Sequence, residues 1–239
     1  MGACLECQSV HFLSKIKSLQ FQSQLVCLEN PPLEFSDAGF QHLPALLHSD
    51  GSGGTDRDVL NEIESKYPGG ILNPDSKDLG LAENVTKNVY PLFCEYMQNT
   101  DISRVLGALQ ALDNYLSNRE SNFLLGSEIS LLDCIVLPQL HEIRVVMERV
   151  KDTPVPDGLR KLWMYLFHGY QKTLKSTCPN DMEICLAWTQ KLGLPASIIK
   201  MPEWLPQEHH GTYHSFNIPN LAICPARCPR REQEEELIK

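Results

Sequence analysis

The stretch that decides the fold is Phe123-Leu-Leu-Gly-Ser-Glu-Ile-Ser-Leu-Leu-Asp-Cys134. It contains Ser130-x-x-Asp133, the spacing at which a serine and an acidic residue cap the first turn of a helix reciprocally. Ile129 stands directly before the cap, where a hydrophobic residue packs back onto the helix. We therefore predict a helix that begins after Ser130, with Ser130 and Asp133 serving folding rather than catalysis.

Apolar residues recur every three or four positions on both sides of this stretch, as in amphipathic helices that share a core. The stripes are Ile102, Val105, Leu109, Leu112 and Leu116, then Leu132, Val136, Leu140, Ile143 and Met147, then Leu159, Leu162, Leu166 and Tyr170. Pro179 suits the first turn of a last helix, and Gly193 suits its end. The pattern predicts an all-helical domain over residues 76–193.

The remaining chain divides into three parts by composition. Residues 1–67 are typical of a small α/β unit, residues 68–75 are rich in proline and glycine and predict a linker, and residues 194–239 hold six prolines and predict a tail draped over the body or loosely ordered. Within the α/β unit we expect a helix over 8–17, β-prone runs at 24–28 and 43–47, a glycine-rich turn at 49–54, and a helix capped by Thr55 or Asp56 that ends near Lys66.

Composition narrows the class of protein. The 239 residues carry a net charge of −9, which argues against a nucleic-acid partner. No apolar run reaches the length of a membrane helix, and Met1 is followed by neither a basic start nor an apolar run, so we expect no secretory signal. Nine cysteines in a chain of this size favour free thiols in a reducing cytosol.

Cys4-Leu5-Glu6-Cys7 directly precedes the first expected helix. Unpaired N–H groups and the helix dipole stabilise a thiolate there, so Cys4 could attack a disulfide and Cys7 could resolve the mixed disulfide. Inert thiols and a zinc site are the alternatives. Zinc would need ligands such as His209, His210, His214, Cys224 and Cys228, whose spacing fits no established zinc pattern, so we expect no metal.

Two later features fit a glutathione site. A cis Pro44 would expose the Leu43 backbone to an extended peptide, although an ordinary trans proline on an edge strand explains the same residues. Thr55 and Asp56 at a helix start could hold the γ-glutamyl group, although a plain N-cap is the alternative.

In this order of motifs the chain resembles the chloride intracellular channel family, in an invertebrate-type form with a divergent N-terminus and tail. The matching segments are Gly2–Gln8, Leu43-Pro44, Thr55-Asp56, Leu112–Leu116, Phe123–Cys134, Leu137–His141 and Ser176–Asp181. The resemblance implies a thioredoxin-like N-terminal domain, an all-helical domain of the glutathione-transferase type, and glutathione bound between them. It also implies glutaredoxin-like activity and a cytoplasmic form that enters membranes reversibly and conducts chloride and other anions.

The chain departs from the family pattern at its start. The family places a strand before the thiol motif, and here the motif begins at residue 4, so we expect an N-terminal domain with that strand missing or remodelled. The family's membrane segment corresponds to about residues 8–28, where Lys15 and Lys17 oppose insertion of a lone helix. Insertion would need homo-oligomeric partners, and the two lysines would then attract anions in a pore. In the folded form they are expected on a solvated surface.

Two functions follow, an anion channel with a thiol site or a purely soluble glutathione-dependent oxidoreductase. A scaffold that binds partners through its helical domain and tail is a third reading.

Overall fold

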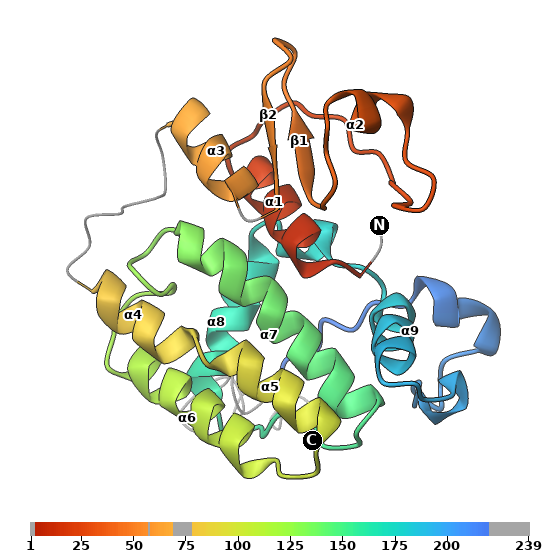
Figure 1. Ribbon diagram of the computed structural model, residues 1–239. Coiled ribbons are helices and arrows are strands. Elements are labelled where there is room, and N and C mark those ends of the chain that lie inside the picture. The colour runs from red at the N-terminus through yellow and green to blue at the C-terminus, as the bar shows by residue number, and fades with distance from the viewer. Residues whose placement is uncertain (1–2, 57, 69–77, 220–239) are drawn as a thin grey trace, which may run out of the picture.

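The computed structural model describes residues 3–56, 58–68 and 78–219. Its elements are α1 (Leu5–Ile16), α2 (Leu33–Asp37), β1 (Ala45–Leu47), β2 (Gly53–Thr55), α3 (Asp58–Lys66), α4 (Leu79–Thr86), α5 (Val89–Gln98), α6 (Ser103–Ser117), α7 (Leu131–Arg149), α8 (Arg160–Gln171) and α9 (Asp181–Lys191). Short 3₁₀ helices, η1 to η3, cover Leu174–Thr177, Ala196–Ile198 and Gln207–Thr212. A small N-terminal lobe sits on a larger helical domain (Figure 1).

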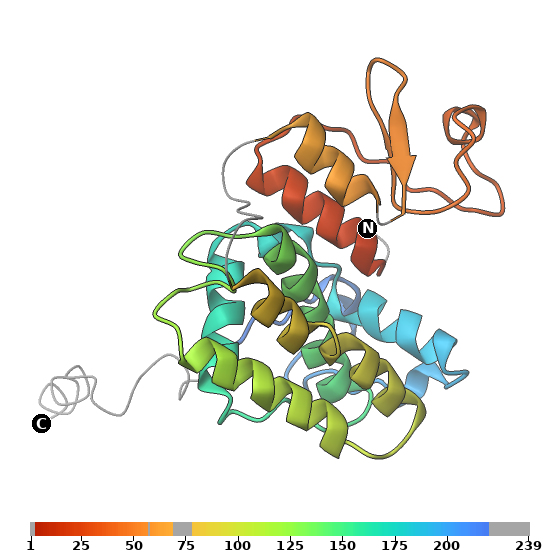
Figure 2. The same ribbon diagram turned by 60° about the vertical axis from the view of Figure 1, so that its left-hand side comes forward.

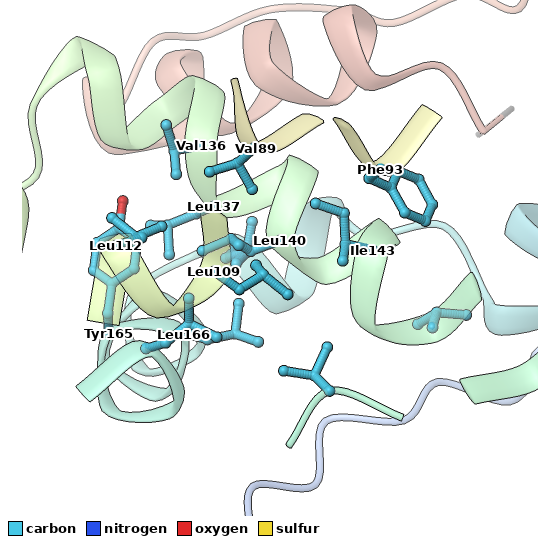
Figure 3. Packing of buried hydrophobic residues seen from close by; sticks show 14 of the residues in the cluster. Val89, Phe93, Leu109, Leu112, Val136, Leu137, Leu140, Ile143, Tyr165 and Leu166 are labelled. Carbon is cyan, nitrogen blue, oxygen red and sulfur yellow. The ribbon is translucent and has the colours of Figure 1, made fainter. Parts of the chain in front are cut away.

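Helix α7 lies at the centre of the molecule. It packs against α1, α5, α8 and α9, and most of its side chains are buried. Figure 3 shows Leu137, Leu140 and Ile143 of α7 meeting Val89 and Phe93 of α5 and Leu109 of α6. The three apolar stripes in the sequence are thus core packing, as predicted.

The predicted helical boundaries are close to those observed. Ser130 is the N-cap of α7, and a capping box with Asp133 is present. Gly193 follows α9 with φ of 64°, a backbone conformation that favours glycine. Pro179 lies outside the helix instead of in its first turn, because the Asn180 side chain accepts from Glu183 N and makes Asn180 the N-cap.

The N-terminal lobe combines α1, α3 and a two-stranded sheet. β1 and β2 pair antiparallel, with Ala45 opposite Thr55 and Leu47 opposite Gly53. α3 packs on both β2 and α1, and both ribbon views show α1 between α3 and the helical domain (Figures 1 and 2). The lobe therefore keeps the helices of a thioredoxin-like unit around a reduced sheet.

The expected strand at residues 24–28 is absent, so that prediction is wrong. The segment is irregular and ends in a turn at Leu28, and Leu25 and Leu28 are 76% and 54% exposed. A strand needs a neighbour to pair its N–H and C=O groups. Within the part of the chain that is described, β1 and β2 pair only with each other, and no strand precedes α1.

The first part of the tail, residues 194–219, packs on the helical domain, which is one of the two arrangements expected for it. η3 packs on α9, and Ser215 is buried. Residues 220–239 and all but Pro68 of the predicted linker lie outside the described residues.

Candidate functional site

Cys4 is the N-cap of α1, which begins three residues earlier than the sequence predicts. The backbone N–H of Cys7 donates to Cys4 Sγ at 3.4 Å, and Gln8 N donates to the Cys4 carbonyl at 2.9 Å. Both thiols are partly exposed. The structure thus places a sulfur where the first N–H groups of a helix have no other partner.

The surroundings shift the pKa values of the two thiols in opposite directions. Hydrogen bonds from the Cys7 thiol and backbone lower the pKa of Cys4 against the opposing effects of burial and the Glu6 carboxylate. The pKa of Cys7 is raised, first by its thiol hydrogen bond to Cys4 and then by burial. Cys4 Sγ lies 3.7 Å from Glu6 Oε2. Of the two thiols, Cys4 is therefore the one whose thiolate form the surroundings favour.

Glu6 is a residue whose role the sequence analysis missed. It stands between the two cysteines in the first turn of α1. Its negative charge opposes ionisation of Cys4. An acidic residue inside a cysteine pair was the available signal, because the spacing alone puts its carboxylate near both sulfurs.

The Leu43–Pro44 peptide bond is cis, in agreement with the family resemblance. Asp56 N donates to the Pro44 carbonyl at 2.8 Å, and Thr55 ends β2 opposite Ala45. Asp56 has φ of 61°, in the left-handed region that favours glycine, asparagine and aspartate. Pro44, Thr55 and Asp56 thus meet at the open end of the hairpin. Both ribbon views place that end beside the start of α1 (Figures 1 and 2).

The alternative of a plain N-cap at Thr55 or Asp56 is not what the structure shows. α3 begins at Asp58, and the Asp56 carbonyl accepts from Val59 N at 3.4 Å, while residue 57 lies outside the described residues. No side-chain cap from Thr55 or Asp56 is present among the described residues. Their binding of glutathione stays a prediction.

A buried contact joins the thiol helix to the helical domain. Gln8 Nε2 donates to Cys178 Sγ at 3.3 Å, and both side chains are buried. Burial raises the pKa of the Cys178 thiol to about 12, so this sulfur is an acceptor rather than a nucleophile. The segment Ser176–Asp181, one of those that carry the resemblance, therefore helps to hold α1.

Glu142 is a buried acid of α7, and its charge interacts with that of Glu6 in the thiol motif. Glu142 Oε1 accepts from Tyr90 OH and Trp188 Nε1, each at 2.7 Å, which ties α5 and α9 to α7. Burial raises the pKa of Glu142, and the Glu6 charge raises it further. Sequence reasoning missed this cluster because Glu142 lies between apolar positions of α7, and its partners come from distant segments.

The two lysines of α1 differ from each other. Lys15 is exposed, as expected for the folded form. Lys17 contradicts the expectation of a solvated surface, because its side chain is 6% exposed and its Nζ contacts Glu64 Oε2 at 2.7 Å and the Tyr67 carbonyl at 2.8 Å. Lys17 fastens α1 to the end of α3, an arrangement that depends on chain folding and has no local signal.

Ser130 and Asp133 have the structural role that the sequence predicts. Asp133 is fully buried; its Oδ2 accepts from Ser130 N at 2.7 Å, and its Oδ1 accepts from Leu124 N at 3.0 Å and Tyr165 OH at 2.7 Å. Burial raises the pKa of Asp133, and these hydrogen bonds lower it.

Asp113 has a related role that the sequence analysis did not assign. Its Oδ1 accepts from Lys161 N at 2.8 Å and Leu162 N at 2.9 Å, so a residue of α6 caps the first turn of α8. The Leu112–Leu116 segment thereby fixes how α8 packs on α6.

No cluster of three metal-ligating side chains occurs among residues 3–56, 58–68 and 78–219. His209, His210 and His214 lie on η3 and just after it, whereas Cys224 and Cys228 fall outside the described residues.

The chain is similar to several known proteins. The family described as "Glutathione S-transferase, C-terminal domain" matches residues 97–166. "Chloride intracellular channel exl-1" of Caenorhabditis elegans is 28% identical over 74% of this chain and 75% of its own length. "Chloride intracellular channel Clic" of Drosophila melanogaster is 27% identical over 77% of this chain and 73% of its own length.

Solved structures show the same fold. EXC-4 of Caenorhabditis elegans, described as a homologue of the chloride intracellular channels, superposes with a TM-score of 0.74 at 19% identity. The match covers 99% of this chain and 88% of the EXC-4 chain. Dehydroascorbate reductase of Chlamydomonas reinhardtii superposes with a TM-score of 0.64 at 18% identity, over 80% of this chain and 91% of its own.

The fold and the capped thiol define a glutathione-transferase-like protein, with a thioredoxin-like lobe on an all-helical domain. Within that class, the curated proteins that the chain resembles are chloride intracellular channels, and one of the two solved structures is described as a homologue of that family.

Proposed function

We propose that this chain is a chloride intracellular channel-like protein whose folded form carries a glutathione-dependent thiol site. The observation that carries the proposal is Cys4 at the N-cap of α1, with the Cys7 N–H donating to its sulfur. A lowered Cys4 pKa, and the Pro44 carbonyl and Asp56 N–H that meet at the end of the hairpin, support a peptide-like thiol as the substrate.

The reaction would proceed by thiol–disulfide exchange. The Cys4 thiolate attacks one sulfur of a disulfide formed between glutathione and a substrate, a new bond to Cys4 forms, and the substrate leaves as a thiolate that takes up a proton. The Cys7 thiol, or a second glutathione, then attacks the mixed disulfide and releases the first glutathione. When Cys7 attacks, the two electrons come from the Cys4 and Cys7 thiols, which end as a Cys4–Cys7 disulfide that two glutathione thiols then reduce. When a second glutathione attacks, it leaves joined to the first as glutathione disulfide. Leu43, Pro44, Thr55 and Asp56 would hold the glutathione backbone.

We further propose that the protein associates reversibly with membranes from the cytoplasm and there conducts anions, as the names of the curated relatives indicate for those proteins. Among the described residues no helix combines the length and the apolar character needed to cross a bilayer. We propose that the conducting state is formed by several copies that rearrange together. Exposed Phe21, Leu25 and Leu28, next to α1, supply apolar contacts for the membrane surface.

A soluble oxidoreductase without channel activity is the second candidate. The geometry of Cys4 favours it, since a capped thiolate has a direct use in disulfide exchange and none in ion conduction. The structural likeness to dehydroascorbate reductase accords with this chemistry at the level of fold.

The test compares wild type, Cys4→Ser and Cys27→Ser, a control that removes an exposed cysteine outside the motif. Disulfide reduction coupled to glutathione tests the enzyme, and chloride efflux from vesicles of acidic lipid tests the pore. We expect Cys4→Ser to lose reductase activity by about 100-fold or more and Cys27→Ser to retain it. Reductase activity without efflux leaves the soluble oxidoreductase. Equal reductase activity in all three proteins would exclude Cys4 as the nucleophile.

A further inference from the structure

A hollow of about 270 Å³ opens on the helical domain, remote from the thiol motif in sequence. The end of α7, the loop at 154–157, Trp163 of α8 and the tail at 215–219 form its walls. Its apolar lining comes from Pro154, Val155, Trp163, Ile218 and Pro219. Ligand pockets for drug-sized molecules begin at about 300 Å³, so the hollow suits a smaller molecule.

Arg144 gives this hollow a buried positive charge. The residue is 4% exposed, and its Nε is buried without a hydrogen-bond partner. Its Nη2 donates to the carbonyl of Ser215 and, at 3.1 Å, to the Ser215 hydroxyl. Within the described part of the chain, no carboxylate forms an ion pair with Arg144. The Asp181 and Glu148 carboxylates act on the Arg144 charge only at longer range, so this buried guanidinium with an open donor favours a further anion beside it.

The neighbouring charges leave Arg144 as the available cation. Arg149 pairs with Glu148 at 3.3 Å and lies 3.5 Å from Asp181 Oδ2, so its charge is already balanced. Glu148 and Asp157 also line the hollow, but the Glu148 carboxylate is 40% exposed and paired, and Asp157 is exposed. The cationic group thus lies deep, and the acidic groups lie at the solvated rim.

The tail wall of the hollow is held firmly in place. Ser215 N donates to Asp181 Oδ1 at 2.9 Å, and the Ser215 hydroxyl donates to Asp181 Oδ2 at 2.5 Å. Phe216 stacks on His141, with ring centroids 5.7 Å apart. These contacts fix this part of the tail against α7 and α9, so binding requires little further ordering of the chain.

We propose that this hollow binds a small organic carboxylate. The carboxylate contacts the Arg144 guanidinium, and the apolar body of the ligand packs against Trp163, Val155 and Ile218. The site is separate from the proposed thiol chemistry.

The test uses the full chain with benzoate as the probe and benzamide as its neutral counterpart. Calorimetry and the indole N–H resonance of Trp163, assigned with Trp163→Phe, follow binding. We expect saturable benzoate binding at about 10 mM or tighter and no saturable binding of benzamide. Arg144→Gln should weaken benzoate binding at least about tenfold, and Arg104→Gln, which removes an exposed arginine of α6, should leave it unchanged.

If Arg144→Gln fails to fold, Ile218→Trp tests the proposal in its place. The indole fills the hollow and leaves the contacts of Arg144 with Ser215 unchanged, so this variant should abolish benzoate binding. The proposal is overturned if benzoate does not saturate, if benzamide binds equally, or if Arg104→Gln has the same effect as Arg144→Gln. The last measurement uses chloride as the ligand. Chloride binding as tight as that of benzoate would assign the site to inorganic anions and overturn the organic carboxylate.

Discussion

Replacing Asp133 by alanine removes the acceptor at the centre of a buried network. Leu124 N, Ser130 N and Tyr165 OH would lose their partner, and all three lie in the interior. A buried donor left without an acceptor costs about 1–3 kcal/mol, and loss of a helix cap costs about 1 kcal/mol. Because the neighbours relax in part, we expect a loss of about 3–5 kcal/mol in the free energy of unfolding.

The assay is thermal and urea unfolding followed by circular dichroism. For a chain of this size each kcal/mol lowers Tm by about 2–4 °C, so Asp133→Ala should lower Tm by about 6–20 °C. Asp133→Asn, which keeps one acceptor oxygen, should fall between wild type and Asp133→Ala. Asp101→Ala is the matched control, because the Asp101 carboxylate is exposed and accepts one bond, from Ser103 N at 2.9 Å. It should cost no more than about 1 kcal/mol. An Asp133→Ala protein as stable as Asp101→Ala would refute the reasoning.

Two other predictions concern the thiol and the helix packing. Glu6→Gln removes a charge that raises the pKa of Cys4, so this pKa should fall. Alkylation of Cys4 by iodoacetamide at neutral pH should then accelerate, as measured in a pH profile with Cys7 replaced by serine in both proteins. A slower reaction of the Glu6→Gln variant would contradict the predicted direction. Gly169→Ala in α8 should destabilise the protein by about 1–3 kcal/mol, because an added Cβ would lie 2.8 Å from Leu137 Cδ2 in the core. Gly107→Ala in α6, where nothing lies within 4 Å, should instead stabilise it by up to about 1 kcal/mol in the same unfolding assay.

Features with local causes could be read from the chain. The Ser130 and Asp133 capping box, the apolar stripes of α6 to α8, and the exit at Gly193 each depend on residues within one or two helical turns. The position of Cys4 at a helix start belongs to this group, with an error of three residues in where α1 begins.

Features that join distant segments needed the folded chain. The strand expected at 24–28 fails for lack of a partner, Lys17 is buried against Glu64, Asp113 caps α8, and Arg144 meets Ser215 across 71 positions of sequence. Propensity and spacing describe a residue's neighbours along the chain, whereas burial and pairing depend on which segments the core brings together. A local motif therefore predicted the position of the Cys4 sulfur at a helix start, and long-range packing produced the buried cation beside the tail.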